Sequence, residues 1–174
     1  MTKWVEVPIS KNHDRDSFDC GDEDLNQYLR RFARQNHESG VSTAFLFVSD
    51  QDSPTILGYY TLSPASIDYD LVPESVRKRF PSYELPVYRL GRLAVDISVQ
   101  GMGLGSHILL AAGRRCINVA AEAGGVAMLI DAKNDRAARW YEGFGAVPAP
   151  DNPLTLLMRL DLIAKSLRAR DSGE

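Results

Sequence analysis

The chain has 174 residues, a length typical of one domain that can bury a sizeable core. Apolar residues make up 44% and charged residues 25%, which is an ordinary soluble balance, and no apolar run is long enough to span a membrane. The net charge of −3 gives no overall attraction to nucleic acid, and the N-terminus has no apolar stretch of signal-peptide length. We therefore expect a single cytoplasmic domain over residues 1–174.

The first part of the chain predicts a strand, a helix and then two strands. The strands are expected at residues 4–9, 43–48 and 56–67. The helix is expected to open at Gly21, with acidic residues in its first turn, and to end at Gly40. An apolar stripe at helical spacing covers one face. The opposite face carries the basic residues Arg30, Arg31 and Arg34.

The middle of the chain predicts a proline-containing connection followed by a central strand. The connection holds a short helix at residues 73–80, which contains the basic run Arg77, Lys78 and Arg79. The central strand at 87–96 carries Arg89 and Arg92. Because side chains alternate along a strand, these two arginines should face opposite ways unless a bulge intervenes.

The last part of the chain predicts two further helices and two strands. The helices are expected at residues 106–123 and 134–145, the second capped by Asn134 or Asp135. The strands are expected at 126–132 and 154–163, before a polar tail that is expected to fray. Cys116 lies on the apolar face of the longer helix and is predicted to be a core residue rather than a nucleophile. The cysteines and histidines have no spacing typical of a metal site. This order of elements predicts an α/β fold, a mixed sheet with helices on both faces.

A glycine-rich turn between the central strand and the long helix is the candidate ligand site. Its sequence is Gln100-Gly101-Met102-Gly103-Leu104-Gly105. Glycines let the backbone approach a ligand closely, and the following helix N-terminus favours an anion such as pyrophosphate. A tight strand-to-helix turn without a ligand is the alternative interpretation.

Two other phosphate motifs do not fit the glycine-rich turn. A dinucleotide-binding fingerprint requires a glycine where this chain has Ser106. It also requires an acidic residue at the end of a second strand about twenty residues later, whereas Glu122 lies late in a predicted helix. A P-loop requires Lys-Ser or Lys-Thr after its last glycine, but His107 follows Ser106 here.

The turn resembles the coenzyme A loop of GNAT acetyltransferases through Gln100, Gly103 and Gly105. The later run Asn134-x-x-Ala137-x-x-x-Tyr141-Glu142-x-Phe144-Gly145 is similar to that family's second coenzyme A segment. The resemblance implies the GNAT fold, with a mostly antiparallel sheet, and acetyl-CoA as cofactor. It implies Tyr141 as the catalytic acid. The implied cofactor-binding residues are Leu93, Ala94, Val95, Gln100, Gly101, Met102, Gly103, Leu104, Gly105, Ser106 and Asn134.

A narrower resemblance points to the GNAT toxins of toxin–antitoxin pairs. It rests on three segments: Phe18-Asp19-Cys20-Gly21 with Leu25-Asn26, the stretch 57–63, and the stretch 90–96. These toxins acetylate the α-amino group of aminoacyl-tRNA and stop translation. The resemblance therefore implies a charged tRNA substrate, a ribbon-helix-helix antitoxin and a homodimer.

The chemistry of acetyl transfer gives Tyr141 a defined role. An α-amino group has a pKa near 8, so a useful fraction is neutral at pH 7 and no strong base is assigned. A tyrosine phenol stays protonated at neutral pH and can donate to the leaving thiolate. Without the resemblance, Tyr141 would be interpreted as a helix residue packed against the sheet.

Local basic clusters offer phosphate-binding surfaces despite the negative net charge. The alternative is that these side chains are solvated surface residues. The candidate tRNA-binding residues are Arg30, Arg31, Arg34, Arg77, Lys78, Arg79, Arg89 and Arg92.

Three functional hypotheses follow from the sequence. In the first, the chain is a tRNA-acetylating toxin. In the second, it is a GNAT enzyme whose substrate is a small amine, an antibiotic or a protein terminus, and in the third it is a non-catalytic coenzyme A-binding module. The glycine-rich turn and Tyr141 argue against the third. The arginine clusters and the toxin-like segments favour the first.

Overall fold

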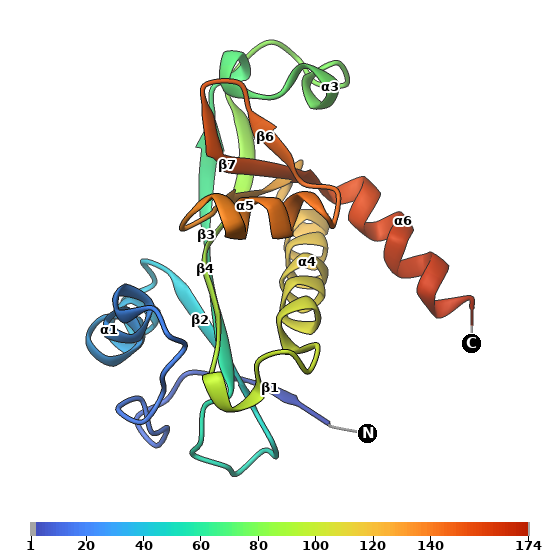
Figure 1. The fold of residues 1–174 in the computed structure, drawn as a ribbon. Coiled ribbons are helices and arrows are strands. Elements are labelled where there is room, and N and C mark those ends of the chain that lie inside the picture. The colour runs from blue at the N-terminus through green and yellow to red at the C-terminus, as the bar shows by residue number, and fades with distance from the viewer. Residues whose placement is uncertain (1–2, 174) are drawn as a thin grey trace. The chain divides into compact units, whose positions relative to one another are not determined.

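The computed structural model describes residues 3–173 (Figure 1). These residues form two compact units. The first unit contains residues 3–63 and 92–110, and the second contains residues 64–91 and 111–173. The strands are hydrogen bonded in the order β1-β2-β3-β4-β5-β7-β6. β4 and β5 run parallel, whereas β1–β2, β2–β3, β5–β7 and β6–β7 run antiparallel. The predicted mixed, mostly antiparallel sheet is therefore confirmed.

The first part of the chain up to β3 forms a three-stranded antiparallel meander with two short helices. Its elements are β1 (Val5–Pro8), α1 (Glu23–Arg31), α2 (Ala33–Ser39), β2 (Thr43–Val48) and β3 (Gly58–Ile67). The remaining elements that contribute to the first unit are β4 (Leu85–Val95), η2 (Ile97–Val99) and α4 (Leu104–Ala123). β3, β4 and α4 each continue into the second unit.

Helices cover both faces of the sheet within the first unit. On one face, Leu46 and Tyr59 pack in a buried core with Leu29 of α1. On the other face, Phe47 and Gly58 are register partners on β2 and β3. The Phe47 ring lies 5.6 Å from the ring of His107 in the first turn of α4. Figure 1 shows α1 and the start of α4 on opposite sides of these strands.

The predicted single helix from Gly21 to Gly40 is wrong, because the chain forms two helices that meet at Phe32. Phe32 has φ −120° and leaves the helical conformation. The break buries Ala33 completely and leaves the Phe32 side chain 51% exposed. In one continuous helix, Phe32 would have extended the apolar stripe. As predicted, α2 ends at Gly40, whose φ of 80° lies in the left-handed region.

The second unit contains the rest of the sheet and the C-terminal helices. Its other elements are η1 (Tyr69–Leu71), α3 (Glu74–Arg77), β5 (Ala127–Asp131), α5 (Asp135–Glu142), β6 (Val147–Ala149), β7 (Asn152–Arg159) and α6 (Leu160–Asp171). Its core gathers buried aliphatic side chains, among them Val72, Val87 and Leu129. Cys116 of α4 is buried, as predicted, and burial raises the pKa of its thiol to about 12. That thiol is therefore a packing residue and not a nucleophile.

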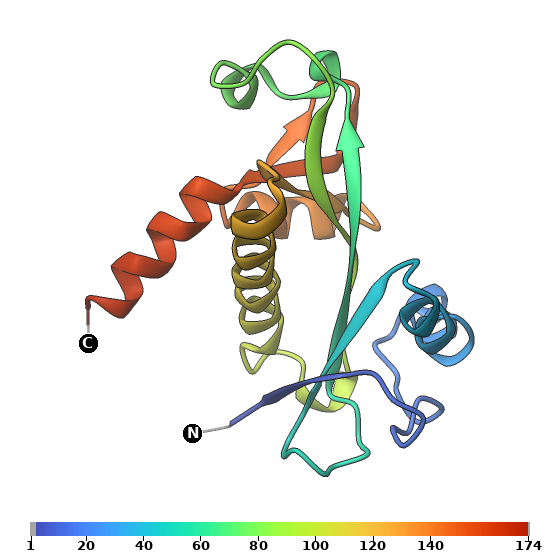
Figure 2. The ribbon, with the colours of Figure 1, turned by 180° about the vertical axis from the view of Figure 1, so that it is seen from behind.

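The C-terminal segment differs from the sequence prediction. The last strand was expected at 154–163, but β7 ends at Arg159 and the chain continues directly as α6 (Figure 2). Apolar residues continue across the boundary between strand and helix, so only their spacing, and not the composition, marks where the helix begins. Leu160, Ile163 and Leu167 are buried at helical spacing. The end of the expected strand and the expected polar tail therefore form one amphipathic helix.

Gly58 makes the approach of β3 to α4 possible, which gives a test of the packing. A Cβ at this position would lie 2.7 Å from the Ile108 Cδ1 atom and 3.1 Å from the Ala94 carbonyl oxygen. We expect Gly58→Ala to lower the free energy of unfolding by about 1–3 kcal/mol, the usual cost of overpacking, in urea denaturation. Gly173→Ala is the control, because its Cβ would make an ordinary 3.4 Å contact. Equal stability of the two variants would contradict this packing.

Candidate functional site

The glycine-rich turn runs from η2 into α4, which begins at Leu104, two residues earlier than predicted. Gly101 and Gly103 have φ values of 79° and 91°, where other residues are strained. A Cβ at either position would meet no atom within 4 Å, so the turn is open on that side. The first helical hydrogen bond joins the His107 N–H to the Gly103 carbonyl oxygen. The preceding N–H groups therefore have no helical partner, which suits an anion.

Gln100 holds this turn in place with its side chain. Its Nε2 atom donates to the Val95 carbonyl oxygen at 2.9 Å and to the Cys20 carbonyl oxygen at 3.0 Å. Both amide hydrogens are thus used within the protein. The side chain that the sequence assigns to cofactor binding thus fixes the position of the backbone that precedes the glycines.

The segment that resembles the toxins reaches the same turn from the other end of the sequence. The Ile97 N–H donates to the Asp19 carbonyl oxygen at 2.8 Å, and the Asp19 N–H donates to the Asp96 carboxylate at 3.0 Å. The buried Asn26 side chain accepts from the Cys20 N–H and donates to the Asp19 carboxylate. These contacts explain why Phe18-Asp19-Cys20-Gly21 and Asn26 occur together: they form a brace beside the turn.

In the second unit, α5 carries Asn134 and Tyr141. Of the two cap candidates, Asn134 and Asp135, it is Asn134 that caps the helix, because its Oδ1 accepts from the Ala137 N–H at 2.9 Å. Its amide nitrogen has no hydrogen-bond partner among residues 3–173 and remains available as a donor. Tyr141 is 6% exposed. Burial, and secondly the nearby Asp131 carboxylate, raise the pKa of Tyr141 above that of an ordinary tyrosine. The phenol therefore holds its proton at neutral pH.

Residues 10–146 match the acetyltransferase (GNAT) family. The chain belongs to this family. Its acyl donor is acetyl-CoA, and the open glycine turn and free helix N–H groups fit the pyrophosphate of that molecule.

Comparison with known proteins places this acetyltransferase among toxins. It is 38% identical over 161 residues to the tRNA-acetylating toxin of Mycobacterium tuberculosis, covering 92% of each chain. The structure of AtaT complexed with acetyl-methionyl-tRNAfMet is similar, with TM-score 0.87 and 25% identity over 95% of this chain and 99% of that one. The structure of AtaTR bound with AcCoA gives TM-score 0.83 and 26% identity over 96% and 99%.

The acetyltransferase does not gather its predicted arginines on one helix. Arg30 lies on α1 and is paired with Glu23 at 2.9 Å, whereas Arg34 lies on α2 and is paired with Glu38 at 3.6 Å. Arg31 is exposed and has no ion pair within residues 3–173. Such exposed pairs are weak, so a phosphate could replace the carboxylates.

The two arginines of β4 have different partners. In the first unit, the Arg92 guanidinium lies 3.5 Å from the centre of the Tyr28 ring, a cation–π contact. In the second unit, Arg89 pairs with Asp131 at 3.0 Å. Each arginine is therefore held by its own unit, and Arg89 pairs with the same carboxylate that acts on Tyr141.

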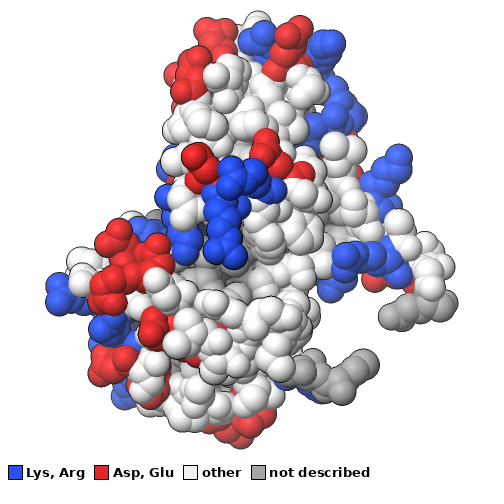
Figure 3. All heavy atoms as spheres, viewed as in Figure 1, with Lys and Arg blue, Asp and Glu red and all other residues white. Residues whose placement is uncertain are grey.

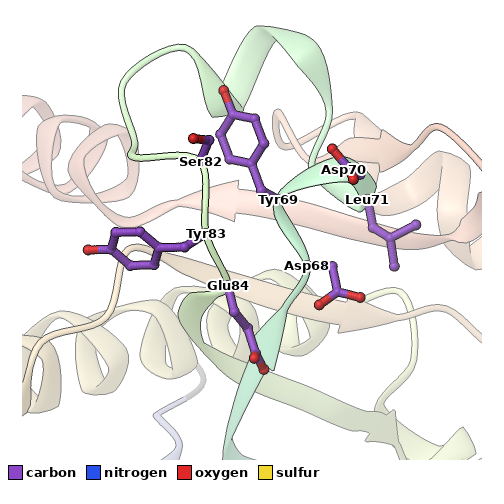
Figure 4. Close-up of a pocket in the computed structure, with 7 residues that line it drawn as sticks. All are labelled: Asp68, Tyr69, Asp70, Leu71, Ser82, Tyr83 and Glu84. Carbon is purple, nitrogen blue, oxygen red and sulfur yellow. The ribbon is translucent and has the colours of Figure 1, made fainter.

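An open hollow of about 490 Å³ lies in the second unit (Figure 4). It is lined by Asp68, Tyr69, Asp70, Leu71, Ser82, Tyr83 and Glu84. Three carboxylates give it the wrong charge for a pyrophosphate or RNA backbone. The neighbouring basic run is also partly engaged, because Arg77 lies over the Tyr69 ring and Arg79 pairs with Asp161. Lys78 is exposed.

Two further observations concern the described residues. In the part of the chain that the structure describes, no group of histidine, cysteine or acidic side chains is arranged to hold a metal ion. No helix within residues 3–173 is long and apolar enough to cross a membrane.

The role of Gln100 gives a direct test of the turn. Gln100→Glu keeps the shape but places a carboxylate, which cannot donate, against two carbonyl oxygens. We expect the Kd for acetyl-CoA to rise about tenfold, which is the scale of one missing hydrogen bond, in isothermal titration calorimetry. Gln51→Glu, in the exposed turn before β3, is the matched control and should bind normally. Unchanged affinity in Gln100→Glu would show that the side chain does not support the site.

Proposed function

We propose that this acetyltransferase is a toxin that transfers acetyl from acetyl-CoA to the α-amino group of aminoacyl-tRNA and thereby blocks translation. The observation that carries the proposal is the 38% sequence identity, over 92% of the chain, with a relative named as a tRNA-acetylating toxin. The AtaT structure in complex with an acetylated aminoacyl-tRNA supports the same substrate class.

Bound acetyl-CoA supplies the activated acetyl thioester, and the chain supplies the groups around it. The backbone N–H groups of 101–106 hold the pyrophosphate, and the backbone of Leu93, Ala94 and Val95 binds the pantetheine arm. Asn134 donates its amide hydrogens to the cofactor. This division of roles is supported by the open turn and by the Asn134 cap, which leaves the amide nitrogen without a partner in the described residues.

Tyr141 donates the proton that the leaving sulfur needs. Its raised pKa keeps the phenol protonated throughout the physiological range. The attacking α-amino group has a pKa near 8 and is partly neutral at pH 7, so water can accept the proton it loses. One proton is lost at nitrogen and one is gained at sulfur, which balances the transfer.

The RNA and protein partners follow from the same assignment. The tRNA backbone is attracted by the basic residues Arg30, Arg31, Arg34, Arg77, Lys78, Arg79, Arg89 and Arg92. Phosphates can displace Glu23 and Glu38 from the α1 and α2 arginines, because those pairs are exposed. The toxin acts in the cytoplasm as a homodimer and is neutralised by a ribbon-helix-helix antitoxin.

Acetyl transfer to charged tRNA tests the proposed function. We expect the purified protein to move label from acetyl-CoA to aminoacyl-tRNA and not to uncharged tRNA, since only the former has an α-amino group. Acid gel electrophoresis after mild base treatment should locate the label on the released amino acid. Labelling of free amines or peptides, with no transfer to any charged tRNA, would favour the small-amine or protein-terminus enzyme instead.

Tyr141→Phe tests the proton donor. The variant should keep its fold and its acetyl-CoA affinity, and its turnover should fall by about 10²-fold, the usual scale for a general acid. In the wild type, the raised pKa means that ionisation of Tyr141 does not reduce turnover below about pH 10. Single-turnover rates measured across the pH range check both statements. Wild-type turnover in Tyr141→Phe would make Tyr141 a packing residue.

A further inference from the structure

Helix α5 has an exposed side whose composition the cofactor site does not explain. Ala138 and Tyr141 are buried. The opposite side carries Arg136, Arg139 and Trp140, and Phe144 follows just after the helix. Trp140 is 37% exposed and Phe144 is 38% exposed, although both are large apolar side chains that normally pack inside.

The two exposed rings form one aromatic surface. The Trp140 and Phe144 ring centroids are 4.8 Å apart at an interplanar angle of 63°. The Trp140 ring also lies 5.0 Å from the Tyr141 ring, edge to face. The aromatic surface therefore runs from solvent to the side chain that we assign as proton donor.

Two arginines lie on the same side of α5 as these rings. Arg136 and Arg139 are exposed, and neither makes an ion pair with any residue that the structure describes. Figure 3 shows basic side chains over α5. The acidic residues of the helix, Asp135 and Glu142, are seven positions apart and share a different line along the helix from Trp140.

We propose that the aromatic–basic face formed by Arg136, Arg139, Trp140 and Phe144 binds the unpaired 3′ end of the aminoacyl-tRNA. Single-stranded RNA ends are recognised by stacking bases on aromatic rings, while arginines neutralise the adjacent phosphates. Double-stranded RNA has no free base faces to occupy such rings, and a small amine has no phosphates to occupy the arginines. The inference rests on the proposed function and names the element that holds the substrate.

The placement of this face suits the reaction. The amino acid is esterified to the last nucleotide of the unpaired end, so the reacting amine lies within one residue of the bases that stack. Trp140 and Tyr141 are adjacent on α5. The helix that holds the 3′ end would therefore also carry the proton donor, and one element would position both reacting groups.

Substitution of Trp140 tests the stacking. We expect Trp140→Ala to raise the KM for aminoacyl-tRNA about tenfold, as removal of one base–aromatic stack does, without changing the KM for acetyl-CoA. Trp140→Phe keeps an aromatic face and should restore most of the affinity. A purely structural role would instead change the KM for acetyl-CoA together with that for aminoacyl-tRNA. Tyr83→Ala is the control, because Tyr83 is 65% exposed and lies in the acidic hollow of the same unit.

Substitution of the arginines tests the phosphate binding. The double variant Arg136→Gln, Arg139→Gln should raise the KM for aminoacyl-tRNA. It should also reduce the slope of log affinity against log salt by about 0.7 for each single-strand phosphate that is no longer neutralised. Arg168→Gln with Arg170→Gln, on the exposed side of α6, is the matched control and should leave the slope unchanged. An unchanged slope in the α5 variant would overturn the inference.

A fluorescence measurement separates this inference from the proposed function. The chain has two tryptophans, so Trp4→Phe leaves Trp140 as the single reporter. A short oligoribonucleotide with the sequence of a tRNA 3′ end should quench the Trp140 fluorescence, whatever amine the enzyme acetylates.

Quenching without acetylation of any charged tRNA would overturn the proposed function alone. Acetylation with normal KM in the α5 variants and no quenching would overturn the inference alone. A raised KM for acetyl-CoA instead would assign the face to the cofactor's adenine and overturn the inference.

Discussion

The amide of Gln100 is the contact on which the organisation of the cofactor site depends. By donating to the carbonyl oxygens of Val95 and Cys20, it joins the end of the central strand to a segment from the start of the chain. Asp19 adds its own bonds to Asp96 and Ile97. The glycines that follow are conformationally free in the unfolded chain, so a turn of this composition needs an external support before its N–H groups can converge on an anion.

The two sides of α5 explain how one short helix serves two tasks. Its buried side holds Tyr141, where burial and Asp131 keep the phenol protonated. Its exposed side carries two partly exposed aromatic rings, Trp140 and Phe144, beside two exposed arginines. Exposed side chains of this kind indicate a partner, and the chemistry of base stacking with phosphate neutralisation selects an RNA end. The acidic hollow between η1 and β4 has the opposite charge and is unsuited to that substrate.

The sequence predicted the elements whose signals are local. The glycine turn and the Gly40 stop depend on backbone rules that act within a few residues, and both were correct. The same rules left Asn134 or Asp135 as the cap of α5, and the cap is Asn134. The break at Phe32 was missed because burial of Ala33, a tertiary effect, overrides the helical stripe. Helix α6 was missed because the spacing of the apolar residues changes from every second residue to helical spacing, and no glycine or proline marks the boundary. The bonding of Gln100 joins residues eighty positions apart, which no spacing within one segment can predict.

The central claim is that the toxin-like segment around Asn26 and the side chain of Gln100 support the acetyl-CoA turn as one unit. A double-mutant cycle on acetyl-CoA affinity, with Asn26→Ala and Gln100→Ala measured singly and together by calorimetry, tests it most directly. Both side chains act through Cys20, so removing either releases much of what the other holds. The account predicts that each single variant weakens binding and that the double variant is weakened by clearly less than the sum of the two. Effects that add within about 0.5 kcal/mol, or an affinity that neither change alters, would contradict it.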